Sequence, residues 1–143
     1  KKRNKKEMMM KVAIIGSRSY TNSRKVKDFI FKLKENFGDE LEIVSGGQKE
    51  GSDGYAKKFA LELDVKYSEF PPQHYPYNIH CVRPKFEYGR KYYVSNYFKR
   101  NKQIANYSDR VVAFVSNSKN ITSGTLSTLK YAEKLNKKSI IID

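Results

Sequence analysis

Three short segments of this 143-residue chain carry residue types that bind phosphate groups. The first, Gly16 to Ser19, reads Gly-Ser-Arg-Ser, in which the glycine permits a tight turn and the arginine offers a forked contact to phosphate oxygens. The second, Ser45 to Gly47, ends in two glycines that let a ligand approach the backbone, and the third is Ser123 to Thr125. Each segment alone is a common turn sequence, so its function depends on whether the fold brings the three together.

The hydrophobic pattern places each of these segments between a strand and a helix. Short apolar runs predict buried strands at residues 12–15, 41–44, 65–70, 111–115 and 139–142. Apolar residues at helical spacing predict helices over residues 26–37, 55–63 and 123–136, and a further helix is expected to end near Tyr107. The first of these helices is expected to have Asn22 or Ser23 as its cap and to end at Gly38.

Strands that alternate with helices indicate an α/β, Rossmann-like fold, in which one parallel sheet carries helices on both faces. We expect the strand order 3-2-1-4-5, so that the direction of winding changes between the first and fourth strands. Ligands of such sheets bind beyond the carboxyl ends of the strands at this switch point. Because all three segments follow strands at that edge, their convergence predicts a nucleotide or phosphate site.

Further polar residues belong to the same edge. Arg100 and Asn101 lie on the helix before the fourth strand, from which they can reach the predicted cleft, and residues 116–118 follow that strand. Asp53 opens the helix after the second strand and fits either a helix cap or an acceptor for a ribose hydroxyl. The candidate ligand-binding residues are therefore Gly16, Ser17, Arg18, Ser19, Ser45, Gly46, Gly47, Asp53, Arg100, Asn101, Ser123, Gly124 and Thr125.

An aromatic-rich insertion, residues 71–95, separates the third strand from the following helix. It holds all four prolines and has no clear period, which fits either a lid or binding surface or a small satellite core. His74, His80 and Cys81 fall in this region, but they lack the spacing of a metal site. The sequence therefore predicts no metal and no resident cofactor.

The charge balance is compatible with a nucleic-acid partner. Lys and Arg number 29 against 15 Asp and Glu, a formal net charge of +14 that suits contacts with phosphates. Part of this charge belongs to residues 1–10, which we expect to form a disordered basic tail before a single domain over 11–143. The excess of Lys over Arg is also what an AT-rich coding sequence produces without selection for binding.

Other features of the composition limit the class of protein. The chain has one Cys and no stretch of roughly 18 apolar residues, so neither a disulfide framework nor a membrane span is expected. These features indicate a cytoplasmic protein, and the formation of homo-oligomers stays open.

The glycine-bearing segments resemble the SLOG superfamily. The resemblance rests on five segments in order: Val12 to Arg18, Val44 to Gly47, Gly51 to Asp53, Arg100-Asn101 followed by Asp109, and Ser123 to Thr125. The small stand-alone YspA-like members, common in bacteria and their phages, are the most similar. The resemblance implies a Rossmann-like domain of a bacterial or phage-infected cell that binds or senses a nucleotide or a nucleotide-derived ligand.

Two related families offer alternative functions. The DNA-processing protein A family shares the Gly-Ser-Arg pocket and uses it on single-stranded DNA, which would make this chain a DNA-binding protein. The cytokinin-activating phosphoribohydrolases share the fold and cleave the N-glycosidic bond of nucleoside monophosphates, with an Arg and with a Glu from the motif Pro-Gly-Gly-x-Gly-Thr-x-x-Glu. Arg100 resembles that Arg, and Gly124-Thr125 match the centre of the motif.

The rest of the hydrolase motif is absent. Residues 120–122 read Asn-Ile-Thr where the motif has Pro-Gly-Gly, and Thr128 stands at the position of the catalytic Glu. A threonine hydroxyl does not act as a carboxylate base near neutral pH, so the sequence disfavours this hydrolysis and leaves Asp53 or Glu50 as substitute acids. The loop over residues 47–51 is also one residue longer than is usual in the family.

Overall fold

The computed structural model describes residues 9–70 and 94–143 of the chain. The predicted basic tail and the aromatic-rich insertion lie outside these ranges, except for their last residues. Met10, assigned to the tail by the sequence, is instead the first residue of the first strand, where it pairs with Leu41.

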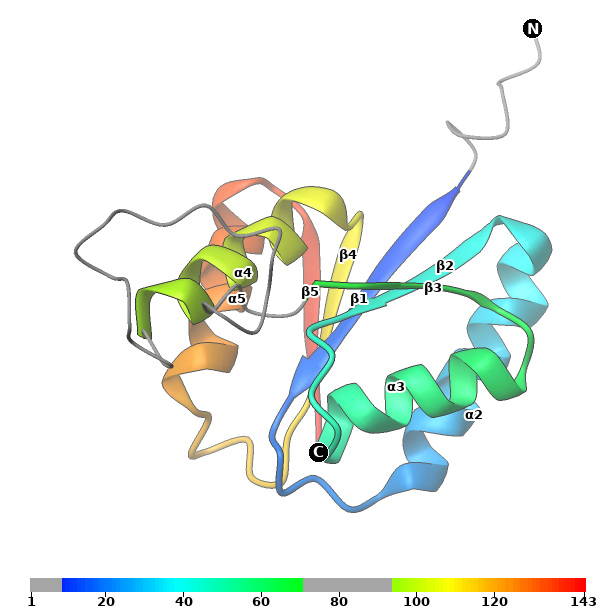
Figure 1. Cartoon of the computed structure of the whole chain (residues 1–143), viewed down its shortest axis with the longest axis horizontal. Helices are drawn as coiled ribbons and strands as arrows, with labels where there is room; N and C mark the ends of the chain where they lie inside the picture. The colour runs from blue at the N-terminus through cyan, green and yellow to red at the C-terminus, as the bar shows by residue number, and fades with distance from the viewer. Residues whose placement is uncertain (1–8, 71–93) are drawn as a thin grey trace, which may run out of the picture.

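Five parallel strands form one sheet in the order β3-β2-β1-β4-β5, which confirms the predicted Rossmann-like topology (Figure 1). The strands are β1 Met10–Gly16, β2 Leu41–Ser45, β3 Lys66–Glu69, β4 Arg110–Phe114 and β5 Lys138–Ile142. The direction of winding changes between β1 and β4, which pair from Val12 opposite Arg110 to Gly16 opposite Phe114. Both strands therefore reach the carboxyl edge of the sheet at the same level.

Two pairs of helices cover the two faces of the sheet (Figure 1). One pair consists of α2 Ser23–Phe37 and α3 Gly51–Glu62, and the other of α4 Val94–Tyr107 and α5 Ser123–Lys134. A short 3-10 helix, η1 Gly38–Glu40, connects α2 to β2. In the described ranges, no helix combines the length and the apolar character that a bilayer crossing requires.

The central strand β1 is buried from both sides because each face contributes to a separate core. Val12 and Ile14 pack with α2 and α3, whereas Ala13 and Ile15 pack with α4 and α5. This arrangement explains why the strand is a continuous apolar run in the sequence. The edge strand β5 differs, since Ile140 and Ile141 are 50% and 46% exposed.

Helix α2 begins and ends at the capping residues that the sequence predicts. The side chain of Asn22 accepts a hydrogen bond from the backbone N–H of Lys25 at 3.2 Å, so Asn22 rather than Ser23 is the cap. Gly38 takes a φ of +58° directly after the helix, a conformation that glycine adopts without strain.

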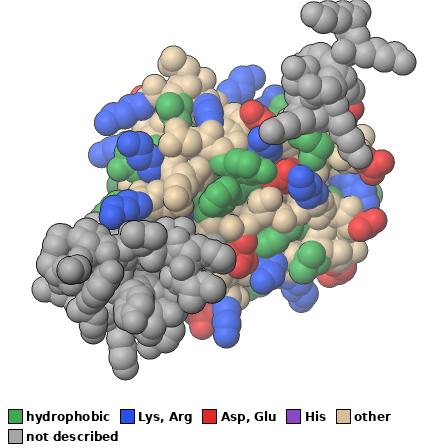
Figure 2. Space-filling view, turned by 45° about the horizontal axis from the view of Figure 1, so that its top comes forward, with side chains coloured by type: hydrophobic (Ala, Val, Ile, Leu, Met, Phe, Trp, Pro, Cys, Tyr) green, Lys and Arg blue, Asp and Glu red, His purple; other side chains and the backbone are tan. Residues whose placement is uncertain are grey.

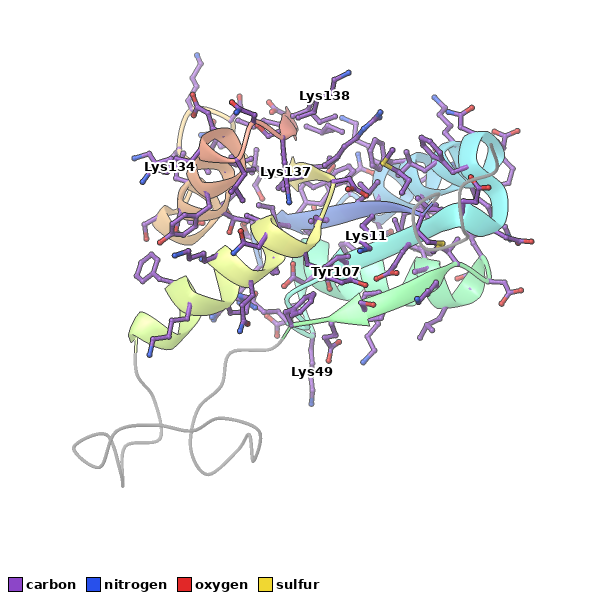
Figure 3. All side chains as sticks on the ribbon, turned by 90° about the horizontal axis from the view of Figure 1, so that it is seen from above. Lys11, Lys49, Tyr107, Lys134, Lys137 and Lys138 are labelled. Carbon is purple, nitrogen blue, oxygen red and sulfur yellow. The ribbon has the colours of Figure 1, made fainter. Side chains whose placement is uncertain are left out.

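Glu42 is an acid in the middle of the sheet that the sequence analysis did not single out. It is 1% exposed, and it accepts hydrogen bonds from the hydroxyls of Tyr107 and Ser68, the latter at 2.7 Å. Lys66 Nζ lies 3.3 Å from the other carboxylate oxygen, and Lys11 lies over the Tyr107 ring at 4.3 Å (Figure 3). Burial raises the pKa of Glu42, but these donors outweigh it and hold the pKa below its ordinary value.

We expect Glu42→Gln to remove a pH-dependent part of the stability. Because the folded-state pKa of Glu42 is lowered, its contribution is present above the ordinary pKa of a glutamate and is lost as the pH falls through the folded-state value. Urea unfolding should show the substitution lowering the free energy of unfolding by about 1.5 to 3 kcal/mol near neutral pH. The difference should shrink toward zero below about pH 4, and a difference independent of pH would contradict the ionised role of Glu42.

Candidate functional site

A cavity of about 540 Å³ lies at the carboxyl edge of the sheet, at the switch point between β1 and β4. Its walls come from the loop after β1, the loop after β2, one side of α4 and the start of α5. This volume is within the range of small-molecule sites.

Most of the residues predicted for ligand binding line this cavity. They are Gly16, Ser17, Arg18, Ser19, Gly46, Asp53, Arg100, Asn101, Ser123, Gly124 and Thr125. Ser45 and Gly47 are not part of the lining. Ser45 is fully buried, and its hydroxyl lies 2.5 Å from that of Tyr67 and 3.4 Å from the backbone nitrogen of Gly47, so it supports the loop from beneath.

Gly16 brings the first loop into close contact with β4. Its φ is +142°, and a Cβ at this position would lie 2.0 Å from the carbonyl oxygen of Phe114. The same oxygen accepts hydrogen bonds from the backbone N–H of Ser17 at 3.2 Å and from the Ser52 hydroxyl at 2.8 Å. Glycine at position 16 therefore lets β1, β4 and α3 meet at one carbonyl group.

Serine hydroxyls gather just beyond Gly16. Ser17 Oγ and Ser19 Oγ are 2.5 Å apart, and Ser19 Oγ is 3.0 Å from Ser116 Oγ on the loop after β4. Next to them, the exposed side chain of Arg18 donates from Nε to Gln48 Oε1 at 3.3 Å. Hydroxyls and a guanidinium at the mouth of a cavity form a suitable setting for an anion.

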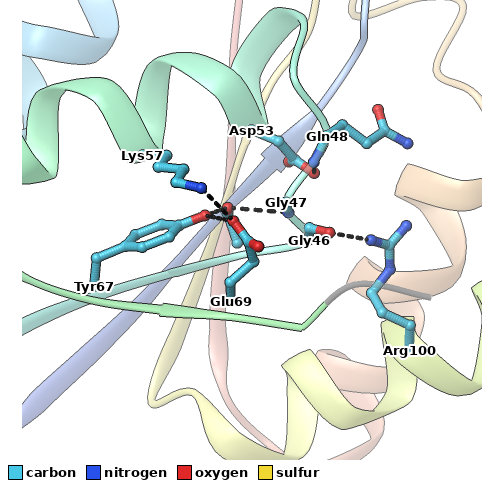
Figure 4. A network of polar contacts seen from close by, with 9 residues as sticks. Gly46, Gly47, Gln48, Asp53, Lys57, Tyr67, Glu69 and Arg100 are labelled. Atoms are coloured by element: carbon cyan, nitrogen blue, oxygen red, sulfur yellow. Dashed lines mark hydrogen bonds and ion pairs between the residues drawn. The ribbon is translucent and has the colours of Figure 1, made fainter. Parts of the chain in front are cut away.

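Arg100 connects the loop after β2 with α4 (Figure 4). It is 7% exposed, and its Nη1 donates to the carbonyl oxygen of Gly46 at 2.9 Å. Its Nε donates to Asn101 Oδ1 at 2.9 Å, and Asn101 in turn donates to the carbonyl oxygen of Gly124 at 3.2 Å. A Cβ on Gly46 would lie 2.1 Å from Arg100 Nη1, so the glycine makes room for the guanidinium.

Asp53 is a buried carboxylate of the cavity wall. It does not cap α3, where Glu50 occupies the cap position, but accepts a hydrogen bond from the backbone N–H of Gln48 at 3.4 Å. Burial raises the pKa of Asp53 to about 6, although the positive charge of Arg100 and the backbone donors oppose this change. The pKa of Asp53 therefore lies above that of an ordinary aspartate.

A second polar network fixes the loop after β2 from the outer side (Figure 4). The Tyr67 hydroxyl donates to Glu69 Oε1 at 3.1 Å, and Lys57 Nζ lies 3.4 Å from the same oxygen. Gly47 has a φ of +79°, and a Cβ there would meet the Glu69 side chain at 2.6 Å. Burial, as the largest cause, raises the pKa of Tyr67, so Tyr67 stays a neutral hydrogen-bonding group.

Several residues that complete the cavity were not predicted from the sequence. Gln48, Phe98, Ile104 and Thr122 join its lining, as do Ile15 at the end of β1 and Thr128 on α5. The Thr128 hydroxyl donates to the carbonyl oxygen of Gly124 on its own helix at 3.2 Å. Among the described lining residues, Asp53 is the one carboxylate.

The structure does not test the weak metal candidates. His74, His80 and Cys81 lie outside the described residues, and within the described residues no three His, Cys, Asp or Glu side chains are grouped as metal ligands would be.

Comparison with known proteins shows that the chain is similar in fold to several solved structures. No family model matches the chain, and no curated protein matches it either. Among solved structures, DNA processing protein A from Helicobacter pylori superposes with a TM-score of 0.67 and 23% identity. The match covers 96% of this chain and 66% of that protein, so this chain spans slightly less than two thirds of its length.

Two further similar structures are molybdenum cofactor proteins. The molybdenum cofactor binding protein from Rippkaea orientalis has a TM-score of 0.64 and 21% identity, over 93% of this chain and 76% of that one. The molybdenum cofactor carrier protein from Chlamydomonas reinhardtii has a TM-score of 0.58 and 16% identity, over 93% and 76% of the two chains. This chain therefore shares a Rossmann-like α/β fold with DNA processing protein A and with molybdenum cofactor carriers.

Proposed function

We propose that the chain is a SLOG-type module that binds or senses a nucleotide or a nucleotide-derived ligand in the cavity. The observation that carries the proposal is the convergence of two glycine-bearing loops, the glycine-bearing start of α5 and two arginines on one cavity at the switch point. Backbone amides at a helix start and arginine side chains are the groups that recognise phosphate.

The cavity offers different chemistry on its different walls. Arg18 and the hydroxyls of Ser17 and Ser19 suit a phosphate at the mouth, whereas Phe98 and Ile104 provide apolar surface for a base. Asp53 repels a phosphate but accepts hydrogen bonds well, so it suits the hydroxyls of a ribose. These assignments fit a nucleotide better than an inorganic anion alone.

The burial of Asp53 supports a functional role for this side chain. A carboxylate that folding removes from water destabilises the protein unless it is compensated, and for Asp53 burial raises the pKa more than the charge of Arg100 lowers it. Such perturbed groups in cavities are typical of binding and catalytic sites.

Single-stranded DNA binding is the second candidate. The structure of DNA processing protein A concerns its single-stranded DNA binding mode, and Arg18 stands exposed at the mouth of this chain's cavity, where a longer ligand would pass. Molybdenum cofactor is the ligand named for the other two similar structures, so it should be tested for binding alongside nucleotides and single-stranded DNA. A mass-spectrometric inventory of the small molecules released from the purified protein would identify the class directly.

Phosphoribohydrolase activity is the enzymatic alternative, and the residues of the site disfavour it. Thr128 stands where the related hydrolases have a catalytic Glu, and its hydroxyl is already hydrogen-bonded to the backbone of α5. Asp53 lies on a different wall, at the start of α3, close to the positive charge of Arg100.

Arg18→Ala should weaken the binding of a phosphate-bearing nucleotide by about 1.5 to 3 kcal/mol, the range of a charge-assisted hydrogen bond. Calorimetry against a panel of nucleoside mono-, di- and triphosphates would first select a ligand of the parent protein. Arg24→Ala is the matched control, because Arg24 is an exposed arginine outside the cavity lining. Equal affinities for the parent and Arg18→Ala would remove Arg18 from the site.

Asp53→Asn should stabilise the protein at neutral pH. The folded-state pKa of about 6 is raised, so the stability linked to protonated Asp53 is full at low pH and is lost as the pH rises through that value. Asparagine keeps an acceptor for the Gln48 N–H without the charge, and the expected gain is about 1 to 3 kcal/mol at pH 7. Thermal unfolding from pH 4 to 8 measures it. Destabilisation at every pH would show that the ionised carboxylate is fully compensated.

The protein should release little or no free base from nucleoside monophosphates. Cleavage of the N-glycosidic bond needs a carboxylate that stabilises the charge on the ribose or activates water, and a threonine hydroxyl supplies neither. Chromatography of the reaction products is the measurement. Robust base release that disappears in Arg100→Ala would contradict this expectation and establish the enzyme.

A further inference from the structure

The two helical layers of the molecule differ in the balance of their charges. On the α2–α3 side, through the turn that follows each helix, basic and acidic side chains are nearly equal in number. The basic ones are Arg24, Lys25, Lys27, Lys32, Lys34, Lys57 and Lys58, and the acidic ones outside the buried site are Asp28, Glu35, Asp39, Glu40, Glu62 and Asp64. This side is therefore close to neutral.

The α4–α5 side is strongly basic. Five lysines are exposed there, and we call them the lysine face: Lys99, Lys102, Lys130, Lys134 and Lys138. Through the turn that follows each helix, the described acidic residues on this side are Asp109 and Glu133. Figure 2 shows blue side chains over this side of the molecule and a mixture of red and blue over the α2–α3 side.

The lysine face keeps its charge unpaired within the described residues. The three ion pairs found there join Lys27 to Glu62, Lys57 to Glu69 and Lys66 to Glu42, and none includes a lysine of this face. In contrast, the neighbouring Lys137 turns inward and donates to the carbonyl oxygens of Ala105 and Asn106 at 2.7 Å (Figure 3).

The spacing of the lysines places them in rows. Lys99 and Lys102 are three residues apart on α4, and Lys130 and Lys134 are four apart on α5, so each pair occupies one side of its helix. The two helices pack against each other, which brings both pairs to the same layer. Coding bias alone would raise the number of lysines in every element and does not explain why acids are scarce in only one layer.

We propose that the lysine face binds the phosphate backbone of a nucleic acid. Rows of lysines with few acids suit a partner whose negative charges repeat at regular intervals, and counterion release then provides the binding free energy. The same two helices line the cavity through Arg100, Asn101 and the start of α5, so the lysine face and the cavity belong to the same helical layer. An acidic protein has irregularly placed charges and is the less suitable partner.

The test compares two triple variants of the full chain. Lys102→Gln, Lys130→Gln and Lys134→Gln together neutralise the lysine face, and Arg24→Gln, Lys32→Gln and Lys58→Gln together neutralise as many exposed cations on the α2–α3 side. Both variants have the same net charge and the same residues 1–8, so any binding by those residues is common to them. Circular dichroism and thermal unfolding check that both variants fold.

The probe is a fluorescent oligo(dT) strand, titrated by anisotropy at several salt concentrations, with a duplex of equal length as the second arm. If each lysine contacts one phosphate, the lysine-face variant loses about 2 from the log-log salt slope for the single strand and about 10- to 100-fold in affinity near 0.1 M salt. The α2–α3 variant should resemble the parent. Whichever of the two probes, single strand or duplex, the protein binds more tightly identifies the form of nucleic acid.

Three results would overturn the proposal: no binding by the parent, equal losses in the two variants, or polyglutamate binding as tightly as oligo(dT). Calorimetry with a nucleotide that binds the cavity separates this surface from the proposed function. The lysine-face variant should keep the parent's nucleotide affinity, because none of its substituted residues lines the cavity. Failure of nucleotide binding in the parent would count against the cavity and not against the lysine face.

Discussion

The carbonyl oxygen of Phe114 is the point on which the architecture of the site depends. It accepts hydrogen bonds from the Ser17 backbone and from the Ser52 hydroxyl, and it lies where a side chain at position 16 would be. One acceptor therefore joins the ends of β1 and β4 to the start of α3. The cavity opens at this junction because three segments approach it closely without filling the space beyond.

Much of the fold was predictable because its signals are local. Continuous apolar runs indicate strands buried on both faces, and glycines after these runs indicate turns at one edge, which is sufficient for the strand order and for most of the cavity lining. Ser45 and Gly47, which the sequence predicts for ligand binding, are not among the residues that line the cavity. All five residues of β2 are buried, so pattern alone does not show that the Ser45 hydroxyl contacts Tyr67 and not a ligand.

Other features of the structure have no local signal. Glu42 is an acid within an apolar strand, and its burial depends on Tyr107, which lies 65 residues away in the sequence. Gln48, Phe98 and Ile104 join the cavity only through the way that loops and helices pack. The same holds for the raised pKa of Asp53, since desolvation is a property of the folded surroundings and not of the residue type.

The register between β1 and β4 has a consequence for the order of folding. Val12 pairs with Arg110, so the sheet joins its two halves across most of the chain length, whereas β1 to β3, and likewise β4 and β5, pair with strands nearby in the sequence. Contacts between segments close in the sequence tend to form before contacts between distant ones. We therefore expect pulse-labelled refolding to protect the amides that join β1 to β4 later than those that join β1 to β2 and β4 to β5. The cavity would then be completed only in the last step, and a ligand would act on the late half of the pathway by slowing its reopening.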